Sequence, residues 1–156
     1  MKDALEVLLL IVVANAAPVI AALIFSNHGT LAIDFGKKLK DQQYIFGVTK
    51  TWRGLLSSIL ITSLTAMVLG FSYITGVYIA VFSMLGDLLS SFIKRRFKKN
   101  SSTRIIFLDQ IPESLLPVIF MTQLIMLNLM QAIAIIISFI IIELILSTLF
   151  LRFYTR

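Results

Sequence analysis

The sequence lacks cysteine altogether and contains only one histidine and eight acidic residues among 156. Without cysteine there are no disulfide bonds, no thiolate catalysis and no cysteine-rich metal sites. His28 cannot form a zinc site by itself, because such a site needs at least three protein ligands. The first apolar run lacks a basic leader and a small-residue cleavage site, so no cleavable signal peptide is expected.

Hydrophobic residues, by contrast, make up 58% of the chain, and the mean hydropathy is +0.96. This composition is typical of integral membrane proteins. Five apolar stretches are close to the roughly 20 residues that cross a hydrocarbon core. We therefore predict an all-α integral membrane protein, a single domain over residues 1–156 that forms a bundle of five transmembrane helices. The predicted spans are residues 4–25, 55–71, 73–93, 111–128 and 129–151.

The basic residues predict the orientation of this bundle. The polar loops 26–54 and 94–110 and the end of the chain contain every lysine and arginine except Lys2. Five spans place all of these cations on one side, which the positive-inside rule assigns to the cytoplasm. The N-terminus is then outside and the C-terminus cytoplasmic. The net charge of +6 reports topology here, and no nucleic-acid partner is expected.

Asp87 lies inside an apolar run, and a basic cluster follows it within two helical turns. If residues 73–96 form one helix, then Asp87, Ser91, Lys94 and Arg95 share a face. Asp87 would lie roughly 10 Å below the cations. A carboxylate at that depth must be paired, protonated or bound to a cation. A self-contained ladder of Asp87, Ser91 and Arg95 is the structural alternative.

Asp109 precedes the fourth span and fits an N-cap, because Pro112 and Glu113 follow in the first turn. A capping carboxylate can also bind a metal. Because Asp87 and Asp109 both lie near the cytoplasmic ends of their helices, they could share one Mg²⁺ with substrate phosphates.

Three further stretches contain polar groups that could contact a substrate. Lys50, Thr51, Trp52, Arg53 and Gly54 would suit a polyphosphate, with Trp52 as a stacking surface, or would equally suit a membrane interface. Asn15, beside Pro18, needs either an interhelical hydrogen bond or a substrate contact. Asp34 would by default be a solvated loop residue. Glu143, in the last span, receives no catalytic role and should be protonated or paired with another span.

In order, these stretches resemble the CDP-archaeol synthase family, membrane enzymes related to phosphatidate cytidylyltransferases. The resemblance runs from ANAAP at residues 14–18 through IDFG at 33–36 and KTWRG at 50–54. It continues with GDLLSSFIKRR at 86–96 and LDQ at 108–110. The chain departs from the family at Ala32, where proline is common, along residues 97–107, and after Gln110, where a further carboxylate would have to come from Glu113.

The resemblance implies an enzyme that joins CTP to a membrane lipid phosphate, giving a CDP-activated lipid and pyrophosphate. The lipid would be unsaturated archaetidic acid or phosphatidic acid. Asp87 and Asp109 would hold Mg²⁺, Lys94 and Arg95 would bind phosphates of either substrate, and Lys50 and Arg53 would bind the triphosphate. Thr51, Trp52, Asn15, Asp34 and Ser91 would be supporting contacts. The expected partners are CTP, the lipid phosphate and the bilayer of the cytoplasmic membrane, and a homodimer is compatible with the pattern.

Two other classes fit the composition. A small transporter or channel component would use the intramembrane carboxylates Asp87 and Glu143 as an ion pathway. A membrane scaffold would use the cations only to bind anionic lipid surfaces.

Overall fold

The computed structural model describes residues 2–26, 28–99, 105 and 107–154, with side chains as far as Thr148. Its helices are α1 (Lys2–Phe25), α2 (Trp52–Val68), α3 (Tyr73–Arg96), α4 (Gln110–Ile125) and α5 (Leu129–Tyr154). The predicted cations Arg104 and Arg156 lie outside the described residues. The five predicted segments coincide with these five helices within a few residues, so the all-helical prediction is confirmed.

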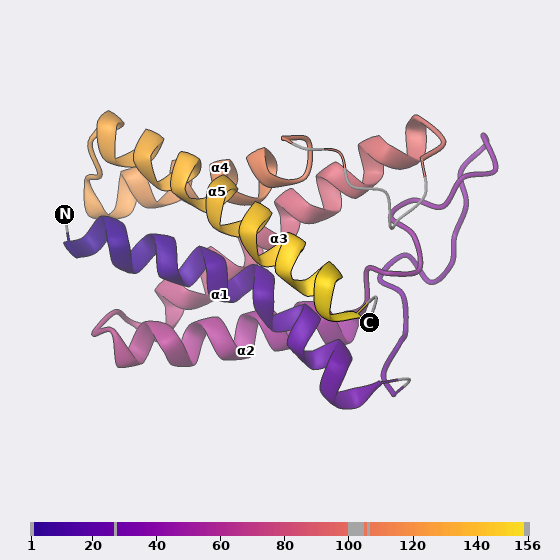
Figure 1. Cartoon of the computed structure of the whole chain (residues 1–156), viewed down its shortest axis with the longest axis horizontal. Coiled ribbons are helices and arrows are strands. Elements are labelled where there is room, and N and C mark those ends of the chain that lie inside the picture. The colour runs from indigo at the N-terminus through magenta and orange to yellow at the C-terminus, as the bar shows by residue number, and fades with distance from the viewer. Residues whose placement is uncertain (1, 27, 100–104, 106, 155–156) are drawn as a thin grey trace.

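The helices lie side by side in one elongated bundle (Figure 1). The long connection between α1 and α2 and the start of the α3–α4 connection lie at one end, toward which α5 also runs. The N-terminus and the short turns after α2 and α4 lie at the other end. The two polar loops are therefore neighbours in space, although about 60 residues separate their midpoints.

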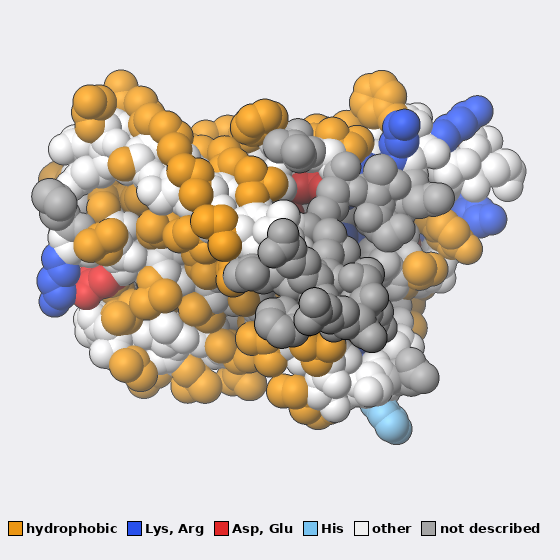
Figure 2. Space-filling model, viewed as in Figure 1, with side chains coloured by type: hydrophobic (Ala, Val, Ile, Leu, Met, Phe, Trp, Pro, Cys, Tyr) orange, Lys and Arg blue, Asp and Glu red, His pale blue; other side chains and the backbone are white. Residues whose placement is uncertain are grey.

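Hydrophobic side chains cover much of the outside of the bundle, while lysine and arginine gather at the loop end (Figure 2). Inside, a core of fully buried residues joins α1, α3, α4 and α5, including Val7, Leu10, Ile79, Val118 and Phe139. Among the described residues, α1, α3 and α5 over Leu129–Thr148 are long and apolar enough to cross a membrane. The exposed apolar surface fits a lipid environment, where no water must be excluded from it.

Pro18 determines how α1 and α2 pack. Proline has no N–H, so the carbonyl of Ala14, four residues earlier, loses its partner within the helix. The hydroxyl of Ser58 in α2 donates to that carbonyl over 2.7 Å. Gly54 faces Pro18 so closely that a Cβ on Gly54 would lie 3.2 Å from the Pro18 Cβ. The carbonyl that Pro18 leaves without a partner in α1 is thus hydrogen-bonded by α2.

Two glycines let α3 approach its neighbours. A Cβ on Gly76 would lie 2.5 Å from the Ser63 Cα in α2, and one on Gly86 would lie 2.2 Å from the Pro112 carbonyl oxygen in α4. Both distances are far below van der Waals contact. Gly86 therefore allows the first turn of α4 to lie against α3 beside Asp87.

Asp34 and Arg96 organise the long loop between α1 and α2. The Asp34 carboxylate accepts hydrogen bonds from the backbone amides of Gly36, Phe46 and Gly47 over 2.9–3.0 Å. Arg96, at the end of α3, pairs with Asp41 and donates to the Tyr44 carbonyl. These contacts tie the loop to the end of α3, at the end of the bundle where the cations gather.

The helix ends differ in detail from the predicted spans. The α2 helix begins earlier than predicted, because the Thr51 hydroxyl caps the Gly54 amide. Met126 adopts a left-handed conformation with φ 53°, which ends α4 at Ile125, three residues before the predicted boundary. Asp109 occupies the N-cap position of α4, but the predicted capping hydrogen bond is wrong, since its side chain makes none.

Candidate active site

A cavity of about 960 Å³ opens between α1, α3 and α5 beneath the long loop. Its apolar lining comes mainly from α1 and α5. Its polar lining residues are Asn15, Thr30, Thr49, Lys50, Thr51, Arg53, Asp87, Glu113, Glu143 and Ser147. Lys50, Asp87, Glu113 and Glu143 lie close together, and we call them the inner end of the cavity. A cavity with charged residues at one end and apolar residues along its walls suits an amphiphilic substrate.

Lys50 and Asp87 form the central ion pair of this cavity. The Lys50 Nζ lies 2.5 Å and 2.6 Å from the two carboxylate oxygens of Asp87. Both side chains are 21% exposed, so the pair remains accessible from the cavity. Lys50 comes from the loop directly before α2 and Asp87 from the middle of α3. The charge partner of Asp87 is thus a residue 37 positions away, and not a cation of its own helix.

Two further carboxylates surround this pair. The Glu113 side chain, from the first turn of α4, lies beside that of Asp87 and close to Glu143 and Lys50. Glu113 is only 7% exposed. Three helices and the loop therefore bring three carboxylates to one lysine. Carboxylates buried so close together must be paired, protonated or bound to a cation.

Asp109 forms a second ion pair with Lys94. The Lys94 Nζ lies 2.7 Å from Asp109 Oδ1, and both side chains are nearly buried. Asp109 also accepts a hydrogen bond from the Ile105 amide. Within the described part of the chain, Asp109, Lys94, Arg95 and Ser91 are not among the residues that line the cavity. Each predicted metal ligand is thus paired with a lysine of its own.

Asn15 and Arg53 both line the cavity, and each also has a structural contact. The Asn15 amide donates to the Ile11 carbonyl of its own helix over 2.9 Å. The expected interhelical bond is instead made one residue earlier, at the Ala14 carbonyl. Arg53 donates to the carbonyls of Ser26 and His28, which ties the end of α1 to the start of α2.

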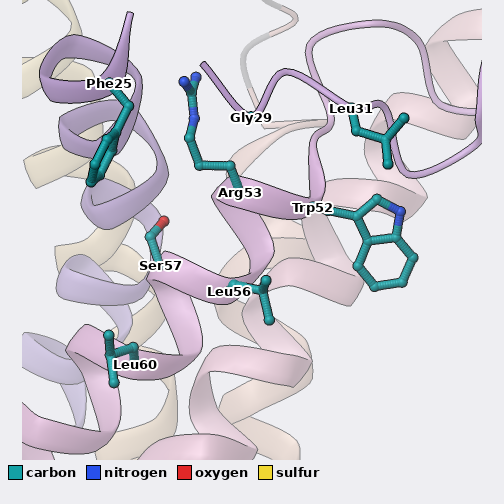
Figure 3. Close-up of a pocket in the computed structure, with 8 residues that line it drawn as sticks. All are labelled: Phe25, Gly29, Leu31, Trp52, Arg53, Leu56, Ser57 and Leu60. Atoms are coloured by element: carbon teal, nitrogen blue, oxygen red, sulfur yellow. The ribbon is translucent and has the colours of Figure 1, made fainter.

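Trp52 lies outside the cavity, in a shallow apolar groove where α2 begins (Figure 3). The groove is also lined by Phe25, Leu31 and Leu56. The Trp52 and Phe35 rings are tilted, with centroids 6.4 Å apart. Of the two roles expected for Trp52, this position favours fixing the loop over stacking on a base.

Asp34 is almost fully buried at 5% exposure, and its carboxylate is enclosed by backbone amides. Burial alone would raise the pKa of this carboxyl, but the amides of Gly47, Phe46 and Gly36 lower its pKa below the ordinary 3.8. This pattern points to a role in organising the loop that carries Lys50.

The loop should therefore lose stability in acid. A folded-state pKa below the unfolded value stabilises the loop above about pH 3.8, and this stabilisation is lost as the pH falls through the lower folded value. Protection of the Phe46 and Gly47 amides in hydrogen exchange, corrected for intrinsic rates, should be constant at neutral pH and fall below pH 3.8. Asp34→Asn should lose about 1.5–3 kcal/mol of this local stability at neutral pH. Unchanged protection in Asp34→Asn would contradict this role.

The inner end of the cavity fits a hard divalent cation. Both oxygens of Asp87 already face a cationic group, and Glu113 and Glu143 supply further carboxylate oxygens. No group of three or more histidine, cysteine, aspartate or glutamate side chains forms a ready-made metal centre in the described residues. One or two carboxylates together with substrate phosphates are enough to hold Mg²⁺.

Sequence reasoning treated Glu113 as a first-turn acid or a possible further carboxylate and gave Glu143 no catalytic role, although both reach the cavity. The available signal was the cost of two ionisable groups within apolar helices. Spacing along one helix could not reveal their partners, because the three carboxylates come from α3, α4 and α5.

Comparison with known proteins agrees with this architecture. The family model described as CarS-like, CDP-archaeol synthase, matches residues 2–72 and 69–154. The CDP-archaeol synthase of Hyperthermus butylicus is 38% identical over 104 residues, which cover 63% of this chain and 59% of that protein. That of Pyrococcus furiosus is 34% identical over 107 residues, covering 62% and 60%. The chain thus matches about three fifths of the length of these curated relatives.

A solved structure, described as an intramembrane enzyme for archaeal membrane lipids biosynthesis, has the same fold. Its TM-score is 0.79 and its sequence identity 25%, over 94% of this chain and 93% of that one. The family match covers nearly all of the helical bundle and both polar loops, which confirms the resemblance. The chain belongs to the CDP-archaeol synthase family.

Proposed function

We propose that the chain transfers a cytidylyl group from CTP to the phosphate of a membrane lipid. A phosphate oxygen of the lipid attacks the α-phosphorus of CTP, and the bond from that phosphorus to the β-phosphate oxygen breaks. The products are a CDP-activated lipid and pyrophosphate. Because the attacking oxygen is already anionic, no general base is needed.

The observation that carries this proposal is the cavity that joins a charged end to apolar walls. A lipid phosphate could reach Lys50 and Arg53 while its chains remain beside Val19, Ile20 and Leu146 of α1 and α5. CTP would arrive from the side of the polar loops. Phosphoryl-type transfer depends on such positioning and on neutralising charge, more than on covalent help from the protein.

The cations have separate tasks in this scheme. Lys50 and Arg53 would bind the triphosphate and later the pyrophosphate, while Lys94 and Arg95 would stabilise the loop-side phosphates. Asp87 and Asp109 would hold Mg²⁺ once their pairs with Lys50 and Lys94 open. The bound ion would offset charge on the phosphate oxygens. Thr51 and Asn15, in or beside the cavity, would contribute neutral hydrogen bonds.

We also propose that all five helices span the cytoplasmic membrane, with the N-terminus outside and the site facing the cytoplasm. The support is the clustering of cations at the loop end (Figure 2) and the positive-inside rule. With 16 and 17 residues, α4 and α2 are at the short end of the helix lengths that cross a hydrocarbon core.

Purified protein should form CDP-lipid from labelled CTP, Mg²⁺ and a lipid phosphate, with one pyrophosphate released per product. Given the name of its relatives, we expect the isoprenoid ether phosphate, archaetidic acid, to react faster than diacyl phosphatidic acid. Thin-layer chromatography of the lipid and a pyrophosphate assay measure the two products. Should neither lipid phosphate react while the protein is folded, the proposed activity is wrong.

A further inference from the structure

Lys50 occupies the place on Asp87 where a divalent cation would sit. Its ammonium group lies almost equally far from the two carboxylate oxygens, at 2.5 Å and 2.6 Å. A cation held by both oxygens of a carboxylate takes this same bridging position. The ammonium group and a metal ion therefore cannot both bind Asp87 in this way.

The backbone of Lys50 is held in place, so only its side chain can give way. The Lys50 carbonyl accepts a hydrogen bond from the Ile33 amide over 2.8 Å, and its own amide donates to Gly47 over 3.2 Å. Thr51, the next residue, caps α2. The Lys50 ammonium group can consequently swing within the cavity, but it remains close to whatever binds there.

A free metal ion would displace Lys50 from Asp87 and bring no anion of its own, so Glu113 and Glu143 would have to serve both cations. The displaced ammonium group would then lie partly buried next to a second cation, and both effects are unfavourable. A metal ion that arrives with a nucleotide brings phosphate oxygens, which can accept the ammonium group as it leaves Asp87. The Lys50 ammonium group then exchanges one anionic partner, the Asp87 carboxylate, for another, a phosphate.

From this geometry we propose that Lys50 reserves the metal position of Asp87, so that the site takes the metal–nucleotide complex in preference to the free divalent ion. This proposal rests on the proposed function in taking Asp87 as the metal ligand and a nucleoside triphosphate as the group that binds with the metal. It assigns Lys50 two successive partners, first the Asp87 carboxylate and then a phosphate group. Lys50 thereby makes metal binding depend on the arrival of the nucleotide.

The experiment measures Mn²⁺ binding by electron paramagnetic resonance, with purified full-length protein and no nucleotide. Wild type should bind Mn²⁺ weakly. Lys50→Met removes the competing charge at similar side-chain length and should tighten Mn²⁺ binding about tenfold or more. Lys50→Arg, which retains a cation that can bind Asp87, should bind no more tightly than wild type. Adding Asp87→Asn to Lys50→Met should abolish the gain.

Lys37→Met is the matched control, because it removes an exposed lysine of the same loop and should leave Mn²⁺ binding unchanged. Equal Mn²⁺ affinity in wild type and folded Lys50→Met would overturn the proposal. If Lys50→Met does not fold, Lys50→Gln replaces it with the same criteria, and a Lys50→Arg variant that binds Mn²⁺ more tightly than wild type would also overturn it. Because the measurement requires no turnover, its result is separate from that of the CDP-lipid assay.

Discussion

Asp87→Asn should reduce formation of CDP-lipid about 10³-fold, while the protein still inserts and folds. Asparagine retains the size of the side chain but removes the charge that would hold Mg²⁺ and that now pairs with Lys50. Removing one group that stabilises charge in a transition state typically reduces turnover 10²- to 10³-fold, and loss of the metal adds to this. Turnover is measured with saturating CTP over a range of Mg²⁺ concentrations.

Asp109→Asn should have a comparable effect if both aspartates hold the ion. The contrast between the two variants is informative, because Asp87 lines the cavity and Asp109 is bound to Lys94 away from its lining. Glu6→Gln is the control. It removes a carboxylate that pairs with Lys2 at the start of α1 and does not line the cavity, so its turnover should stay near wild type. A normal rate for either Asp87→Asn or Asp109→Asn would remove that residue from the proposed metal site.

Gly86→Ala should inactivate the enzyme without touching any charged group. The added methyl would lie 2.2 Å from the Pro112 carbonyl oxygen and 2.6 Å from the Glu113 nitrogen, so the first turn of α4 must move away from α3. Glu113 would then leave Asp87. Overpacking of this kind costs about 1–3 kcal/mol or more. We expect at least a hundredfold loss of turnover together with a lower unfolding temperature.

Gly76→Ala is the matched variant for this prediction. It creates a similar clash, with the Ser63 Cα at 2.5 Å, but ten residues earlier in α3, roughly 15 Å from Gly86 along the helix. It should lower the unfolding temperature while the folded fraction retains its turnover and Mn²⁺ binding. Equal activity losses in both variants would mean that general destabilisation, and not the position of α4, explains the effect of Gly86→Ala.

The sequence was informative where a single helix or a charge count decides the outcome. A polar residue in an apolar helix marks a site by its cost alone, and this singled out Asp87 and Asn15. Ion pairs between residues of different helices or loops were harder to predict from the sequence. The ladder of Asp87, Ser91 and Arg95 was one alternative, but Lys50 reaches Asp87 from the loop. The predicted cap at Asp109 gave way to an ion pair with Lys94, because a buried lysine gains more from a carboxylate than a helix end does.

By itself the sequence determined the class of protein, five apolar helices and the side on which the cations gather. These follow from hydropathy and charge, which depend on composition along the chain. Only the tertiary structure decided which lysine binds which aspartate, that Glu113 and Glu143 join Asp87, and that Trp52 lies in a separate groove. Such contacts depend on how closely helices approach, and here that approach is decided by the absence of a Cβ at Gly86 and at Gly54, which lies against Pro18.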